Sequence, residues 1–172
     1  MRLPALILAI VSAAAPLAEA GSKKPALPAI RLHGEGNPTD GDSFSSEIQL
    51  TNPPKKIFMR KVPVVNEQDF KAFFPFPGND GLSGAYFLLD AHGTNKLHQF
   101  STEDRGRIAV VLVNGRVAAA LLVDKPVNDG ILMVPGGIAP EEILALQQRL
   151  PVIGAESEFG KKPRKKEKPA AE

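Results

Sequence analysis

The strongest folding signals in the chain lie in residues 107–150, which read RIAVVLVNGRVAAALLVDKPVNDGILMVPGGIAPEEILALQQRL. Two apolar runs, Ile108–Val113 and Val117–Val123, flank the dipeptide Asn114-Gly115. Asparagine followed by glycine supplies the positive φ angles of a type I′ turn, which favours a tight β-hairpin. The stretch therefore predicts two antiparallel strands joined by a short turn.

The same stretch continues with a third strand and a helix. A short apolar run, Ile131–Val134, is followed by Gly136-Gly137, and Pro140 then opens a segment with Glu141 and Glu142. Proline at the first helical position and carboxylates in the first turn are typical of a helix start. Free N–H groups after a glycine pair can bind an anion. Because Pro140 has no N–H and both glutamates are negative, we interpret the glycines as features of the fold.

Further elements are predicted upstream from periodicity and from turn residues. Strands are expected at Ala29–His33, Phe44–Leu50, Lys56–Val62 and Ala85–Leu89, and helices at Asn66–Phe74 and Thr94–Thr102. The whole succession predicts an α+β fold, with a mixed or mainly antiparallel sheet of about five to seven strands and two to three helices packed on one face. Pro151 is expected to end the ordered chain.

The helix expected at 66–74 rests on a cap and on three aromatic residues. Asn66 is a favourable N-cap, and Phe70, Phe73 and Phe74 recur at the spacing of one helical face. We interpret these phenylalanines as core residues rather than as a ligand site.

The first twenty residues have the composition of a targeting segment. Met1–Ala20 has a single basic residue, Arg2, then an apolar core, then Ala18-Glu19-Ala20 as a small-residue cleavage site. This pattern predicts a signal peptide, and its apolar core is shorter than the roughly 20 residues that span a bilayer. An uncleaved anchor is the alternative. Residues 21–154 are then expected to form a single domain with a periplasmic or secreted location.

The excess positive charge lies in the last segment of the chain. Residues 155–172 hold six basic and four acidic side chains, whereas residues 21–154 hold fourteen of each sign. A charged segment without apolar periodicity is expected to be a disordered tail. Besides a merely solvated tail, we consider weak contact with an anionic membrane or cell-wall surface. Nucleic acid is not an expected partner of an exported protein.

Composition and motifs give no support to a chemical site. The chain has no cysteine, which excludes disulfides and thiol chemistry. Asp40 and Asp42 lack the spacing of a calcium loop. His92 and His98 are six residues apart, unlike metal-binding pairs on a helix, and we interpret both, with His33, as surface or hydrogen-bonded residues. We therefore expect no enzyme activity and nominate no catalytic, cofactor-binding or metal-binding residue.

The order of these features resembles the head subdomain of the first periplasmic domain of SecD, the protein-export accessory subunit. The shared pattern is a helix that ends in a threonine-containing segment, a glycine before a hydrophobic hairpin, a glycine-led short strand, and a helix opened by two glutamates. The resemblance runs from Tyr86 to Leu150 and rests on Thr102, Gly106, Ile108–Val113, Asn114-Gly115, Val117, Val127, Gly130, Ile131, Gly136, Glu141, Glu142, Leu146 and Leu150. The chain departs from the family at Ala118-Ala119-Ala120, where a proline is common.

This resemblance implies an exported α+β module with a surface for unfolded chains or partner proteins. The transmembrane helices of SecD have no counterpart in the sequence. The resemblance therefore carries over neither a proton-driven pump nor any functional residue.

Two functional hypotheses follow. The first is a non-enzymatic binding module of SecD-head type that contacts exported polypeptides or envelope proteins. Such a module would take a peptide by strand addition at an apolar groove or at the sheet edge Val117–Val123. The alternative is a small periplasmic hydrolase or ligand-binding protein, with a site built from scattered residues such as Asp90, His92 and Asp129. A polar pocket around these three residues would favour the alternative.

Overall fold

The computed structural model describes residues 26–51, 54–78 and 81–156. The predicted signal peptide and residues 157–172 of the predicted tail lie outside this part of the chain. Within it, eight strands form three antiparallel sheets accompanied by two α-helices, which confirms the α+β class and the antiparallel pairing. Neither of these helices is long and apolar enough to cross a membrane.

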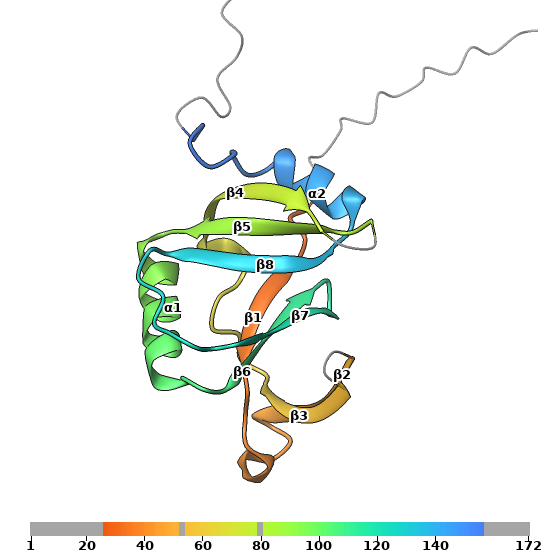
Figure 1. Ribbon diagram of the computed structural model, residues 1–172, viewed down its shortest axis with the longest axis vertical. Helices are drawn as coiled ribbons and strands as arrows, with labels where there is room; N and C mark the ends of the chain where they lie inside the picture. Colours follow the sequence, from red (N-terminus) through yellow and green to blue (C-terminus); the bar gives the residue numbers. More distant parts are fainter. Residues whose placement is uncertain (1–25, 52–53, 79–80, 157–172) are drawn as a thin grey trace, which may run out of the picture.

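The elements follow one another along the chain as Figure 1 shows. They are β1 (Ile30–Gly34), β2 (Ser45–Thr51), β3 (Pro54–Arg60), β4 (Phe70–Pro77), β5 (Ser83–Leu89), α1 (Ala91–Glu103), β6 (Ile108–Val113), β7 (Arg116–Leu122), β8 (Ile131–Ile138) and α2 (Pro140–Gln147). Single 3-10 turns lie at Pro38–Asp40 and Glu67–Asp69.

The strands divide into two three-stranded sheets and a hairpin. The order β1-β6-β7 makes one sheet, here called the β6 sheet, and the order β4-β5-β8 makes the other, the β5 sheet. The third unit is the hairpin β2–β3. The chain passes from the β5 sheet through α1 into the β6 sheet and returns from β7 to β8 (Figure 1).

The hairpin β6–β7 forms as its sequence predicts. Asn114 and Gly115 have φ angles of 48° and 79°, as a type I′ turn requires. Strand β6 is covered on both faces, because Val111 enters the main core while Val110 packs beneath the β2–β3 hairpin. Burial on both sides explains why this strand is an uninterrupted apolar run instead of an alternating one.

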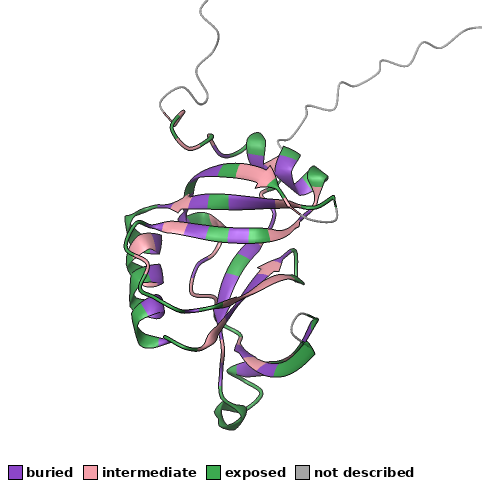
Figure 2. Ribbon diagram, viewed as in Figure 1, coloured by how far each residue is buried: buried purple, intermediate pink, exposed green. Residues whose placement is uncertain are grey.

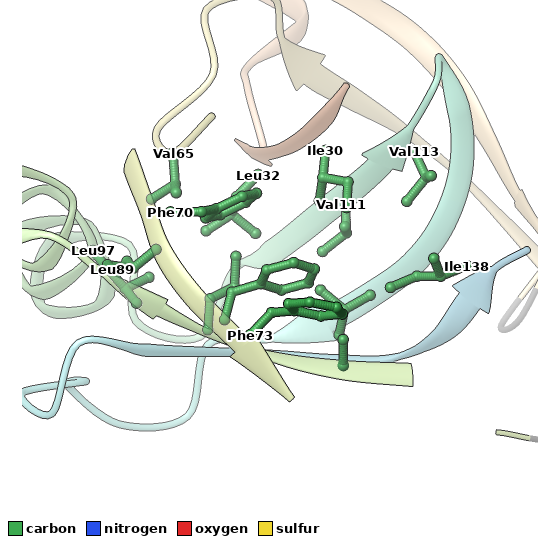
Figure 3. Close-up of a cluster of buried hydrophobic side chains, with 14 of the residues drawn as sticks. Ile30, Leu32, Val65, Phe70, Phe73, Leu89, Leu97, Val111, Val113 and Ile138 are labelled. Carbon is green, nitrogen blue, oxygen red and sulfur yellow. The ribbon is translucent and has the colours of Figure 1, made fainter. Parts of the chain in front are cut away.

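The main core lies between the two sheets and is closed by the two helices. It contains side chains of β1, β4, β5, β6 and β8 together with Leu97 of α1 and Leu146 of α2. Figure 3 shows part of this cluster, with Phe73 packed among side chains from both sheets. Phe87 is fully buried and stacks on Phe70 and Phe73 at ring-centroid distances of 4.5 and 6.2 Å.

The helix predicted at 66–74 is wrong. Asn66 does act as a cap, since its side chain accepts the N–H of Gln68, but it opens only a 3-10 turn. The chain then extends into β4, where it pairs with β5. Phe73 points into the core and is fully buried, whereas its neighbour Phe74 is 49% exposed. Adjacent residues on opposite faces are what a strand produces, and pairing with β5 outweighs the helical spacing of the aromatic residues.

The other predicted helix before the hairpin begins earlier than expected. Asp90, not Thr94, is the N-cap of α1, and its carboxylate accepts the N–H of Gly93 at 2.7 Å. A Cβ on Gly93 would lie 2.7 Å from Cβ of Asp69, so the helix start packs closely on the turn before β4. The predicted turn at Asp90–Gly93 is therefore the first turn of the helix.

Two further boundaries differ from the prediction. Strand β8 continues through Gly136-Gly137 to Ile138 and does not stop at Val134. Pro151 does not end the ordered chain, because the segment after it runs along the outer edge of β4. There Pro151 O accepts the N–H of Phe73 at 3.0 Å, and Ile153 donates its N–H to Phe73 O at 3.1 Å.

Candidate functional site

Strand β7 is open along one edge. In the described part of the chain it pairs only with β6. Val123 donates its N–H to Arg107 O on the β6 side at 3.0 Å. Because backbone groups alternate along a strand, the N–H and C=O of Leu122 and Ala120 point to the open side. An unpaired row of this kind is a template for another strand, and β7 has neither a proline nor a charge beyond Arg116 to block it.

The open edge of β7 meets β8 at one end. A β-bulge in β7 lies at Ala118, between the pairs Val111–Ala119 and Leu112–Val117. Gly137 of β8 lies against this bulge with a φ of +84°, and a Cβ there would be only 2.7 Å from Cα of Ala118. Glycine is required by both the conformation and the close approach. We call the space between the two strands the fork, and the Ala118–Gly137 contact its closed end.

A network of hydrogen bonds holds the closed end. The carboxylate of Glu142 accepts two bonds from Arg116 at 2.8 and 2.9 Å, one from the Asn114 amide at 2.6 Å and one from the N–H of Ala139 at 2.8 Å. Burial alone would raise the pKa of Glu142, but these bonds and the charge of Arg116 outweigh it, so the pKa lies below its usual value. The hairpin turn is thereby tied to the first turn of α2.

The strands diverge from this contact (Figure 1). An apolar groove of about 300 Å³ lies at the open end of the fork. Its lining residues come from β1, α1, the end of β7, the loop after it and the start of β8. They are Leu32, Leu97, Phe100, Ser101, Ala109, Leu121, Leu122, Val123, Asp124, Lys125, Val127, Ile131, Leu132 and Met133.

The walls of the groove are mainly hydrophobic, and its two charged residues, Asp124 and Lys125, are exposed. Leu97 and Phe100 are buried among its lining residues, while Leu122 and Met133 have 66% and 43% of their surface exposed. Figure 2 shows that buried and exposed positions alternate along β8. The hydroxyl of Ser101 is already used, because it donates to His98 O and accepts the N–H of Val127. An aliphatic or aromatic side chain suits such a groove better than a polar substrate does.

Two residues of the alternative hypothesis, Asp90 and Asp129, already accept backbone hydrogen bonds. The carboxylate of Asp90 caps α1, that of Asp129 accepts the N–H of Ile131, and His92 is exposed on α1. None of the three lines the groove. Among residues 26–51, 54–78 and 81–156, no group of three or more His, Asp or Glu side chains could hold a metal ion.

The histidines lie apart from the fork. His98 is exposed, as is His92, while His33 is buried in β1 and hydrogen-bonds to Arg60 O through Nδ1 at 2.9 Å. Burial lowers the pKa of His33. The prediction that the histidines are surface or hydrogen-bonded residues is confirmed.

Sequence reasoning found half of this site. The edge Val117–Val123 was predicted, and it forms one arm of the fork. The other arm, β8, and the loop that closes the groove were missed. The Gly136-Gly137 pair and the unbroken alanines after Val117 were the signals available in the sequence, but neither shows that these two segments touch.

Comparison with known proteins gives a structural likeness alone. No protein-family model and no curated protein matches the chain. It is similar to a crystal structure of SecDF in a super-membrane-facing form and to a structure of SecDF described as a membrane component that enhances protein export. Identity is 11% and the TM-score 0.49 in both cases, over 70% of this chain and over 18% and 60% of the respective SecDF chains. The chain thus spans less than two thirds of either SecDF chain.

Proposed function

We propose that this protein binds extended, apolar segments of other polypeptides without catalysing a reaction. The bound segment adds a strand to the open edge of β7 and places side chains in the groove of the fork. The observation that carries this proposal is an unpaired edge strand directly beside an apolar groove.

The geometry favours a strand over other ligands. Ala120 and Leu122 present N–H and C=O groups on the open side, which match the backbone of an extended chain. Successive side chains of an added strand point to opposite faces, so alternate residues would enter the groove. The contact of Ala118 with Gly137 limits the added strand to the open end of the fork.

The proposed partners follow from the expected location. With a signal peptide, the protein acts in the periplasm or outside the cell, where exported polypeptides and envelope proteins expose extended apolar segments. This role is the one implied by the sequence resemblance to the SecD head.

The decisive experiment removes one backbone donor. Ala120→Pro deletes the outward N–H and leaves the hydrogen bonds to β6 in place, since proline is tolerated where an edge N–H faces solvent. We expect the affinity for a fluorescent peptide of alternating valine and threonine to fall at least about tenfold, as measured by anisotropy.

The matched control is Ala120→Val, which keeps the N–H and favours the strand. It should bind like the parent protein, and both variants should unfold at the parent's urea midpoint. Equal binding by Ala120→Pro and the parent, or no binding by the parent, would refute strand addition.

A further inference from the structure

Strand β8 is also open along one edge, and that edge faces β7 across the fork. In the described part of the chain β8 pairs only with β5. Leu89 donates its N–H to Gly130 O at 2.9 Å, so these two residues form a hydrogen-bonded pair of the β5–β8 ladder. Because backbone groups alternate along a strand, those of Ile131 and Met133 point away from β5, towards the fork. The fork therefore has a strand edge on each side.

Met133 offers the backbone donor of the β8 edge. The N–H of Ile131 is already bound, since it donates to the carboxylate of Asp129 at 3.0 Å. The N–H and C=O of Met133 have no partner strand among residues 26–51, 54–78 and 81–156. On the facing edge, Ala120 and Leu122 of β7 present their N–H and C=O groups in the same way. Each side of the fork can thus bind the backbone of a strand placed between them.

The space between these edges has an apolar inner side. Val123, at the end of β7, and Leu132 of β8 are buried in the main core, and both line the groove together with Leu97 and Phe100 of α1. A strand lying in the fork would point every second side chain at these residues and the others at solvent. The fork therefore suits a segment in which apolar and polar residues alternate.

The loop that joins the two strands is held on the helix side of the fork. Val127 donates its N–H to the Ser101 hydroxyl at 2.8 Å, and Asp124 O accepts from Nε of Arg105 at 3.0 Å. The side chains of Leu122 and Met133, which alternate with the buried ones, are exposed. This arrangement gives an extended segment access to the fork from solvent.

We propose that the bound polypeptide segment is inserted between β7 and β8 and pairs with both edges, which joins the β6 sheet and the β5 sheet into one. This inference rests on the proposed function and adds β8 to it as a second binding edge. Ala118 near the start of β7 meets Gly137 near the end of β8, and the loop after Val123 joins their other ends, so the strands run in opposite directions. The inserted strand is therefore antiparallel to one of them and parallel to the other.

Insertion sets a requirement on the bound segment that addition to one edge does not. A strand held by β7 alone uses every second N–H, so proline is tolerated at the alternate positions. A strand held on both sides also donates to the outward C=O groups of β8 and uses the N–H groups of successive residues. The partner is thus a proline-free extended segment over the length that faces Ala119–Leu122.

The test measures binding of the fluorescent peptide of alternating valine and threonine by anisotropy. Met133→Pro removes the N–H that faces the fork and leaves the hydrogen bonds to β5 in place, while the matched control Met133→Val keeps that N–H. We expect the affinity to fall at least about fivefold in Met133→Pro and to stay at the parent's level in Met133→Val. Urea midpoints equal to the parent's would show that both variants are folded.

The outcomes separate this inference from the proposed function. If Ala120→Pro loses affinity and Met133→Pro binds like the parent, strand addition at β7 stands and insertion is refuted. If the parent does not bind, or Ala120→Pro binds like the parent, both are refuted. A second measurement needs no protein variant: peptides N-methylated on either the valine or the threonine amides should both bind the parent at least about fivefold more weakly. Undiminished binding of one of these two peptides would also overturn insertion.

Discussion

The two ends of the fork differ in how their atoms are held. At the closed end, backbone meets backbone at Ala118 and Gly137, and Glu142 binds Arg116 and the hairpin turn. At the open end, the strands are apart, and exposed apolar side chains such as Leu122 line the mouth of a groove. Directional contacts fix the geometry of the closed end, whereas the open end presents only hydrophobic surface.

This difference shows how an edge strand can stay available in a folded protein. Hydrophobic burial is non-directional, so it would equally allow β7 and β8 to close into one sheet. Charge-assisted hydrogen bonds to Glu142 fix where the strands touch. The bulge at Ala118 turns the strand at that point, and the backbone groups of Ala120 and Leu122 face the edge of β7 that has no partner strand among residues 26–51, 54–78 and 81–156. We therefore expect the closed end to contribute to stability and the open end to the proposed binding.

The largest effect is expected from Gly137→Ala. A methyl group there would meet Ala118 at 2.7 Å on a backbone with positive φ, so the closed end must open. We expect the free energy of unfolding to fall by about 3 kcal/mol, the sum of a left-handed conformation and an overpacked contact. Urea unfolding followed by circular dichroism measures the change.

Gly136→Ala is the matched control for that variant. No atom lies within 4 Å of a Cβ at this position, and its φ is not positive. Its effect on the free energy of unfolding should stay below about 1 kcal/mol. Equal stability of the two variants would mean that the Ala118–Gly137 contact does not hold the fork together.

A smaller effect is expected from Glu142→Gln, which weakens the network at the closed end. The side chain is 9% exposed, and its loss of charge should lower the free energy of unfolding by about 2 kcal/mol at pH 7. The pKa of Glu142 is depressed in the folded protein. Its contribution is therefore fully present above the unfolded pKa of about 4.3 and is lost as the pH falls through the folded pKa.

The measurement compares urea midpoints of the parent and Glu142→Gln at neutral pH and below pH 4. The difference between them should shrink on acidification, because a protonated glutamate resembles glutamine. Glu141→Gln is the matched control, since this neighbouring glutamate is exposed in the same helical turn and should change the free energy by less than about 0.5 kcal/mol. A gap that persists unchanged in acid would contradict the role given to the carboxylate.

Local signals explain which parts of the fold could be predicted from the sequence. The hairpin turn at Asn114-Gly115 and the start of α2 at Pro140 each depend on a few adjacent residues, and both are present. By the spacing of its phenylalanines, the segment Phe70–Phe74 fits one face of a helix as well as it fits a strand. Only its pairing with β5 makes it a strand, and that partner is set by the tertiary fold.

The candidate site was predicted in part for the same reason. The sequence next to the hairpin offers no further strand to pair with β7. The open edge of β7 could therefore be predicted. The fork needs a contact between residues 118 and 137, which depends on a bulge and on a positive φ. Neither is visible in a pattern of apolar residues, because the same alanines could form a regular strand.

The smallest effect should come from the open end, where Leu122→Ser removes apolar surface at the mouth of the groove. With 66% of its surface exposed, Leu122 contributes little to the core, and the free energy of unfolding should change by less than about 0.5 kcal/mol. A bound side chain would lose part of its hydrophobic contact, so the affinity for the alternating peptide should fall about fivefold. Val62→Ser, at a 73% exposed position away from the groove, is the control and should bind like the parent. Leu122→Ser could instead lower the free energy of unfolding and leave the affinity for the peptide unchanged. That result would contradict the assignment of stability to the closed end and of binding to the open end.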